Sequence, residues 1–131
     1  MMEIKNFLMM NNNFMPAFER LLKKEITAKS CLQLSTAYDE IVTQITVIDR
    51  TRQAIAHRYA KRTEDGSISL DAENAIEFDN EDSRLKALCQ IDEILNETLE
   101  VDLDQVVLKP DECMTTEDFI LLKYIVKVAD R

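Results

Sequence analysis

Hydrophobic positions between residues 34 and 59 recur at alternating steps of four and three, the spacing of one face of an α-helix. This interaction seam consists of Leu34, Tyr38, Ile41, Ile45, Ile48, Arg52, Ile55 and Tyr59. No proline or glycine interrupts the stretch from Thr27, a candidate N-cap, to Lys61. The pattern predicts one continuous helix over 27–61 whose apolar edge packs against one or more partner helices.

The seam carries one charged residue, Arg52. On a covered seam its methylene groups can pack over apolar neighbours while the guanidinium reaches an acid on the facing element. The candidate acids are Glu73, Glu77, Asp92 and Glu93. Because an unpaired buried charge is costly, we interpret Arg52 as a residue that fixes the register of packing. Two interpretations of the seam stay open: an intramolecular helical hairpin, or a partly uncovered surface for another subunit or partner.

Three shorter helices are predicted over 14–24, 80–98 and 116–129. Thr115, with Asp118 three residues later, has the capping-box pattern at the start of the last one. That helix is apolar on several faces, so it is either buried or covered by another chain. Its candidate docking face is formed by Phe119, Leu122 and Val126.

Two segments are predicted to be extended. Asp65 and Gly66 supply the turn of an acidic β-hairpin over 64–78, and alternating β-branched residues over 100–109 indicate an extended segment or edge strand. One glycine and two prolines are too few for an all-β fold. The expected fold class is mainly α with minor β, in a single domain over 1–131: a long antiparallel helical hairpin, a small β-hairpin or edge strand, and a C-terminal helix.

The formal net charge of −9 is unevenly distributed along the chain. Residues 1–62 hold ten Lys/Arg and six Asp/Glu, whereas 64–104 hold two Lys/Arg and fourteen Asp/Glu. The acidic block can be read as a solvated face or as a surface that imitates a phosphate backbone. Its candidate surface residues are Asp79, Glu81 and Asp82.

Residues that could carry chemistry are few. His57 has no Ser or Cys nearby in sequence to activate, and the carboxylates of Asp102 and Asp104 would share one face of a strand without a third ligand. The three cysteines, which fit reduced packing residues, are Cys31, Cys89 and Cys113. We therefore predict no catalytic residue, no metal site and no cofactor. Nucleic-acid binding is disfavoured because the acidic block would repel a polyanion.

The longest uncharged run, residues 6–18, is too short and too rich in asparagine to cross a bilayer. The first residues also lack the basic flank and apolar stretch of a signal peptide. These features predict a cytoplasmic protein without a membrane partner.

The order of these features resembles a family of small phage-encoded proteins of unassigned function. The resemblance is carried by "FERLLKKEITAK", a long helix ending "RTRQAIAHRYAKRTEDG", an acidic hairpin, a helix ending "LNETLEVDL" and a Thr-capped last helix. Members are associated with morphogenesis gene regions. The resemblance implies a non-catalytic virion structural or assembly component in the host cytoplasm or the virion, binding other phage proteins or copies of itself. The alternative is an acidic, DNA-mimic-like inhibitor of a host nuclease or nucleic-acid enzyme.

Overall fold

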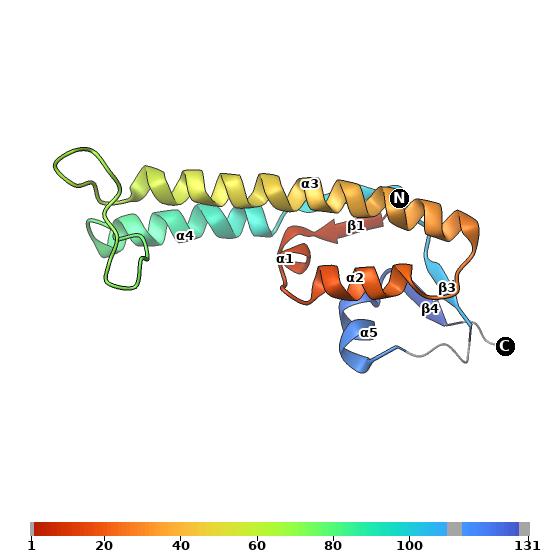
Figure 1. Ribbon diagram of the computed structural model, residues 1–131. Coiled ribbons are helices and arrows are strands. Elements are labelled where there is room, and N and C mark those ends of the chain that lie inside the picture. Colours follow the sequence, from red (N-terminus) through yellow and green to blue (C-terminus); the bar gives the residue numbers. More distant parts are fainter. Residues whose placement is uncertain (1, 110–113, 129–131) are drawn as a thin grey trace. The chain divides into compact units, whose positions relative to one another are not determined.

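The computed structural model describes residues 2–109 and 114–128 (Figure 1). They form a mainly α fold with minor β, as predicted. The described residues divide into two compact units. Unit 1 takes those up to Ile45 and from Thr98 onward, and unit 2 is Thr46–Glu97. The long helix α3, Ala28–Tyr59, contributes residues to both units.

The predicted long helix is confirmed, because α3 runs for 32 residues without a break, about 48 Å at 1.5 Å per residue. It starts where expected: the Thr27 hydroxyl accepts a hydrogen bond from the Ser30 N–H at 3.1 Å. At its other end the Arg62 guanidinium donates to the His57 carbonyl at 3.1 Å. The same carbonyl accepts from the Ala60 N–H at 3.4 Å, and the Arg62 bond places a cation at the negative end of the helix dipole.

In unit 1, helix α2 (Phe14–Leu22) supplies much of the core. Its buried residues follow helical spacing, and all four have no exposed surface: Phe14, Ala17, Phe18 and Leu21. The Phe18 ring lies 6.1 Å from the ring of Tyr38 on α3, centroid to centroid. The Tyr38 hydroxyl also donates to a Glu19 carboxylate oxygen at 2.9 Å, so a terminal helix covers this part of the seam.

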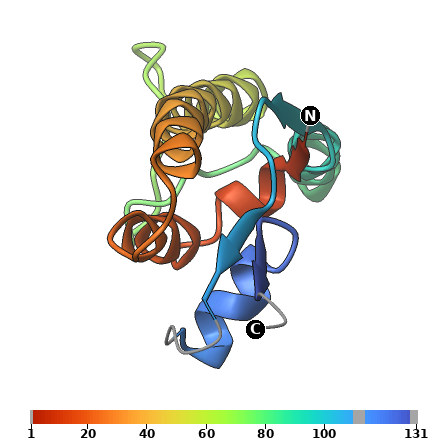
Figure 2. The same cartoon turned by 90° about the vertical axis from the view of Figure 1, so that its right-hand side faces the viewer.

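The strands of unit 1 form two separate two-stranded sheets. Antiparallel pairing joins β1 (Met2–Lys5) to β2 (Thr98–Val101), and parallel pairing joins β3 (Val106–Leu108) to β4 (Val126–Val128). A short helix α1 (Asn6–Met9) follows β1 directly. The segment 100–109, predicted to be one extended stretch, therefore contains the end of β2 and all of β3, which belong to different sheets. Figure 2 shows β3 and β4 side by side.

The predicted helix over 116–129 is wrong in its second half. Helix α5 is Thr116–Leu122, and the chain then turns into β4. The β-branched residues Ile125, Val126 and Val128 are better suited to an extended strand than to a helix when a neighbouring strand is present. That neighbour is β3, which pairs Val106 with Val126.

The first turn of α5 is tied to α2 by a bidentate ion pair. Arg20 donates from Nε and Nη2 to the two carboxylate oxygens of Asp118 at 2.7 and 2.6 Å. Thr115 caps α5, since its hydroxyl accepts from the Asp118 N–H at 3.1 Å. The Asp118 side chain is 7% exposed. Chiefly the hydrogen bonds from Arg20 hold the pKa of the Asp118 carboxyl below its ordinary value.

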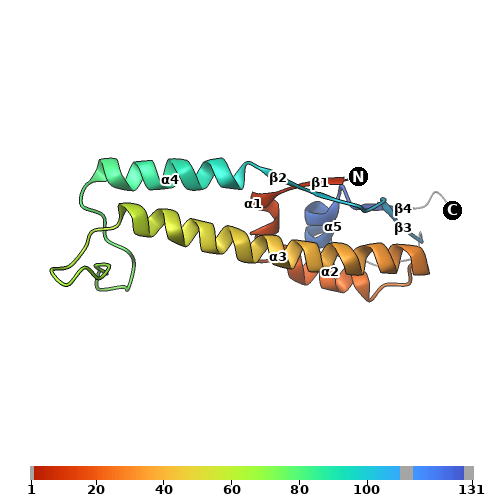
Figure 3. The same ribbon diagram turned by 90° about the horizontal axis from the view of Figure 1, so that it is seen from above.

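In unit 2, helix α4 (Glu81–Leu95) runs antiparallel to the second half of α3, side by side with it (Figure 1, Figure 3). Asn80 caps α4 by accepting from the Ser83 N–H at 2.8 Å. Gln90 links the two helices: its amide donates to the Tyr59 hydroxyl at 2.7 Å and its carbonyl oxygen accepts from Arg58. This pair is the predicted helical hairpin.

The segment between α3 and α4 differs from the predicted two-stranded hairpin over 64–78. Three extended stretches meet there, and backbone hydrogen bonds of 2.8–3.0 Å join Lys61, Ser69 and Glu77 pairwise. The contacts are isolated bridges, not full strands. Gly66 has a φ of 85°, as the Asp-Gly turn requires. A second turn contains Asn74 with a φ of 63°, a conformation that asparagine tolerates, and no glycine marks this turn in the sequence.

We expect Asp118→Asn to destabilise the fold by about 1–2 kcal/mol, because hydrogen bonds to a charged partner are lost. We expect the loss of stability to lie near the lower end of this range, because the Arg20 side chain is 53% exposed and solvent weakens the ion pair. The stabilisation from a carboxyl with lowered pKa is present above its unfolded-state pKa and lost as pH falls through its folded-state pKa. The wild type should therefore lose stability below about pH 4 more steeply than the variant. Urea unfolding between pH 2 and pH 7 measures this difference, and parallel pH profiles would contradict it.

Candidate interaction surfaces

All eight residues of the interaction seam are buried or half-buried. Leu34 and Ile41 have no exposed surface, and Ile48 and Ile55 have 1% and 6%. This favours the intramolecular interpretation of the seam over an open partner surface. Leu34 through Ile45 belong to unit 1 and Ile48 through Tyr59 to unit 2.

Arg52 does not act as the register device that the sequence suggested. Its side chain is 41% exposed, and its guanidinium lies 3.8 Å from the carboxylate of Asp49, three residues earlier on the same helix. An ion pair within one helix cannot set the register between two elements. Arg52 instead lines a shallow surface depression in unit 2 together with Ile76 and Ile91.

The predicted docking face on the last helix is not a single surface. Phe119 is 42% exposed, but Leu122 and Val126 are 0% and 2% exposed and belong to the core of unit 1. Val126 lies on β4 and not on the helix. The exposed large apolar side chains between positions 119 and 128 are those of Phe119, Ile120, Tyr124 and Val128.

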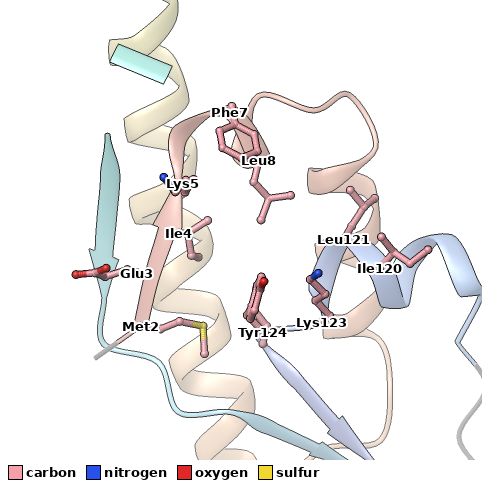
Figure 4. A pocket seen from close by; sticks show the side chains of 11 residues that line it. Met2, Glu3, Ile4, Lys5, Phe7, Leu8, Ile120, Leu121, Lys123 and Tyr124 are labelled. Atoms are coloured by element: carbon pink, nitrogen blue, oxygen red, sulfur yellow. The ribbon is translucent and has the colours of Figure 1, made fainter. Parts of the chain in front are cut away.

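An apolar groove of ≈ 380 Å³ lies in unit 1 between two segments that are distant in sequence (Figure 4). One wall is β1 with the start of α1, and the other is the end of α5 with the turn that follows it. The side chains of Ile4 and Leu8 point from the first wall toward Tyr124 and Leu121. Three lining residues are strongly exposed: Phe7 at 52%, Ile120 at 60% and Tyr124 at 67%.

Three charged residues contribute to the lining of the groove, Glu3, Lys5 and Lys123. The Glu3 and Lys5 side chains leave β1 on the side away from Tyr124, so Lys123 is the cation that lies beside the groove (Figure 4). The ammonium group of Lys123 lies 5.0 Å from the centroid of the Tyr124 ring. That cation–π contact holds the lysine beside the groove. The groove can therefore bind an apolar segment that carries an acidic residue at its end.

The candidate acidic surface is partly neutralised by its own helix. Glu81 forms an ion pair with Arg84, and Asp82 lies 3.1 Å from the ammonium group of Lys86. Asp79 is exposed and precedes the helix cap. Unit 2 as a whole combines seven Lys/Arg with twelve Asp/Glu, because the basic end of α3 belongs to the same unit as the acids.

Two acids of the segment between α3 and α4 build its turns. Asp65 accepts hydrogen bonds from the Thr63 hydroxyl and the Ser67 N–H, and the Thr63 bond is the main cause that lowers the pKa of its carboxyl. Asp71 accepts from the N–H groups of Glu73 and Ala75. These carboxylates are occupied by local backbone and hydroxyl groups, as in Asx-turns.

Asp102 and Asp104 lie between β2 and β3, so they do not share one face of a strand as expected. Among residues 2–109 and 114–128 there is no cluster of three or more His, Cys, Asp or Glu that could hold a metal ion. The Asp104 carboxylate accepts from Gln33 at 3.3 Å and lies 3.6 Å from the Lys29 ammonium group. It ties the loop before β3 to the start of α3. The described helices also include none that is long and apolar enough to span a bilayer.

Unit 2 has its own exposed apolar residues on α4. Leu85 is 52% exposed and Leu88 is 43% exposed, and Cys89 beside them is also exposed. The residue of α4 that is fully buried is Ala87. Cys31 on α3 is exposed as well, and Cys113 lies outside the described residues.

Arg52→Met should change the free energy of unfolding by no more than ~0.5 kcal/mol, because it removes only an exposed intrahelical ion pair. Ile48→Ala on the same helix, at 1% exposure, should cost ~2–4 kcal/mol. Urea titrations of both variants make the comparison. A loss of ~3 kcal/mol or more for Arg52→Met would mean that a buried acid depends on it.

Comparison of the chain with protein-family models, curated proteins and solved structures finds no match to any of the three. The candidate surfaces among the described residues are the groove of unit 1 and the exposed Leu85 and Leu88 on α4.

Proposed function

We propose that this chain is a non-catalytic interaction protein and that the groove of unit 1 receives a segment of a partner protein. The observation that carries the proposal is the exposure of Phe7, Ile120 and Tyr124 around one apolar groove. Leaving large apolar side chains in water is unfavourable by ~25 cal/mol per Å². Contiguous apolar surface of this kind marks interaction sites.

The lining residues suit a protein segment. Tyr and Ile give a large contact area, and aromatic side chains are enriched at the energetic centre of interfaces. Lys123 at the edge of the groove would attract an acidic side chain of the partner. The expected ligand is an apolar segment with a flanking acid, presented by another protein.

We propose further that the partner belongs to a phage particle or its assembly, so that the chain works in the host cytoplasm or becomes part of the virion. Support for this context comes from the resemblance of the chain to small phage-encoded proteins. An exposed apolar groove that would bind a protein segment is compatible with a structural or assembly role. The proposed partner is another phage protein or a second copy of this chain.

The alternative, an inhibitor that imitates a phosphate backbone, has weaker support. Such a decoy needs an array of free carboxylates, yet Glu81 and Asp82 are paired with bases and Asp65 and Asp71 are used in turns. Unit 2 also carries seven Lys/Arg. We therefore place the binding function in the apolar groove and not in the acidic block.

A photo-crosslinking residue in place of Tyr124 tests the proposal in cells that produce the particles. Because Tyr124 is 67% exposed and lines the groove, benzoylphenylalanine at this position should form adducts with a phage structural or assembly protein. Mass spectrometry identifies the adducts. The matched control carries the same probe in place of Leu32, a 70% exposed residue on α3 outside the groove, and should not form them.

Substitution then measures the strength of the contact. The double variant Ile120→Ser/Tyr124→Ser should weaken binding of the identified partner by ~2–4 kcal/mol, thirtyfold or more, while Leu32→Ser leaves it unchanged. Adducts with a host nucleic-acid enzyme, or no difference between the Tyr124 and Leu32 probes, would overturn the proposal.

A further inference from the structure

The strand β1 has one edge without a partner strand. Among the described residues its sheet contains two strands in the order β1–β2, so β1 pairs along one side only. In an antiparallel pair every second residue directs its N–H and C=O groups away from the neighbouring strand. An edge of this kind is a template for pairing with another extended chain.

The groove of unit 1 follows the backbone of β1. All four residues of the strand, Met2–Lys5, contribute to the lining of the groove. The side chains of Glu3 and Lys5 leave β1 on the side away from Tyr124, because successive side chains of a strand point to opposite faces (Figure 4). Glu3 and Lys5 therefore border the groove with their backbone groups.

The second strand of this sheet has different surroundings. Of the described residues, none of β2 lines the groove. Leu99 and Glu100 of β2 instead border a shallow depression beside α3, together with the carboxylates of Asp39 and Glu40. An apolar groove with strongly exposed large side chains thus lies along β1 and not along β2.

We propose that the groove receives its partner segment as an extended strand that pairs with the free edge of β1. This inference rests on the proposed function of the groove, and it adds the conformation and the side-chain pattern of the ligand. In strand addition the backbone hydrogen bonds give affinity, and the side chains of alternate ligand residues enter pockets that give specificity.

A helical segment would leave the free edge of β1 unused. Its N–H and C=O groups are bonded within the helix except at its two ends, so they do not pair with a strand. An extended segment has these groups available along its whole length. At ~3.3 Å per residue the four residues of β1 span ~13 Å, so a ligand strand of about four or five residues covers the edge.

The side chains around the groove define the pattern of the ligand. Ile4 and Leu8 point from one wall toward Tyr124 on the other, so a ligand side chain between the walls meets apolar surface on both sides (Figure 4). The Lys123 ammonium group, 5.0 Å from the centroid of the Tyr124 ring, would attract an acid that adjoins the apolar residues. The expected ligand has apolar residues at every second position and a neighbouring Asp or Glu.

Backbone methylation of a peptide probe tests the extended mode. The probe is a synthetic peptide of about twelve residues, selected from a random displayed library for binding to the full chain. It is accepted as a groove ligand when Ile120→Ser/Tyr124→Ser abolishes its binding and the control Leu32→Ser, outside the groove, does not. Two derivatives carry N-methyl groups on alternate residues of its apolar stretch, one at the odd and one at the even positions.

The two derivatives have identical side chains, but only one set of N–H groups faces β1 in a paired strand. One derivative should therefore bind at least ~tenfold more weakly than the other, because methylation removes the N–H donors and blocks the approach of the strands. Fluorescence anisotropy of the labelled peptides measures the two dissociation constants.

Hydrogen exchange of the full chain gives a second readout. Saturation with the unmethylated probe should slow the exchange of alternate amides over Met2–Lys5, those that point away from β2, by ~tenfold or more. The amides of β2 that point away from β1 are the matched control, and their exchange rates should stay within ~twofold.

Equal dissociation constants for the two methylated derivatives would overturn strand addition, as would unchanged exchange along β1 with the probe bound. Either result would leave the groove as a binding site for a segment of another conformation. A selection that gives no peptide dependent on Ile120 and Tyr124 would instead overturn the proposed function of the groove, and strand addition with it.

Discussion

The packing of one apolar edge of α3 is the constraint on which the rest of the structure depends. Ile41 in unit 1 and Ile48 in unit 2 lie on the same edge of one helix, and both are essentially inaccessible to water. Full burial of such a side chain contributes roughly 1.5–3 kcal/mol, whereas helix propensity alone leaves isolated helices marginal. Each unit therefore buries its own part of the same helix edge.

Because the seam is covered within the chain, the large apolar residues that stay exposed are the candidates for contacts with other molecules. In unit 1 three of them, Phe7, Ile120 and Tyr124, line one groove, and in unit 2 two of them, Leu85 and Leu88, lie on α4. Two carboxylates of unit 1 are held in structural contacts, Asp118 by Arg20 and Asp104 by Gln33.

Much of the local structure could be predicted from the sequence, because its causes are local. The four-and-three spacing gave α3, and Thr27 and Thr115 cap helices where their hydroxyls predicted. The strand β4 could not be predicted, since Val126 becomes extended only because β3 is there to pair with it. Helical periodicity and β-branching compete over such a short apolar run, and only the distant partner decides between them.

The groove could not be predicted either, because it also depends on segments that are distant in the sequence. The groove joins residues 2–8 to 120–125, and no sequence pattern connects segments so far apart. Arg20 and Asp118 are likewise separated by 98 positions. The sequence does carry one local signal: Ile120 and Tyr124 are four positions apart, on a different side of the chain from the buried Leu122. The sequence could not predict the exposure of Arg52, because periodicity places a residue on one edge of a helix but does not fix where a long side chain directs its charged end.

Amide hydrogen exchange along α3 in the dilute monomer tests the central claim most directly. An uninterrupted helix with a buried edge requires slow exchange from Leu34 to Ile55, with no gap where unit 1 meets unit 2 in the sequence at Ile45 and Thr46. Protection at Ile41 and Ile48 that approaches the global free energy of unfolding is the predicted result. Fast exchange at residues 44–48, with protection on both sides, would contradict the account.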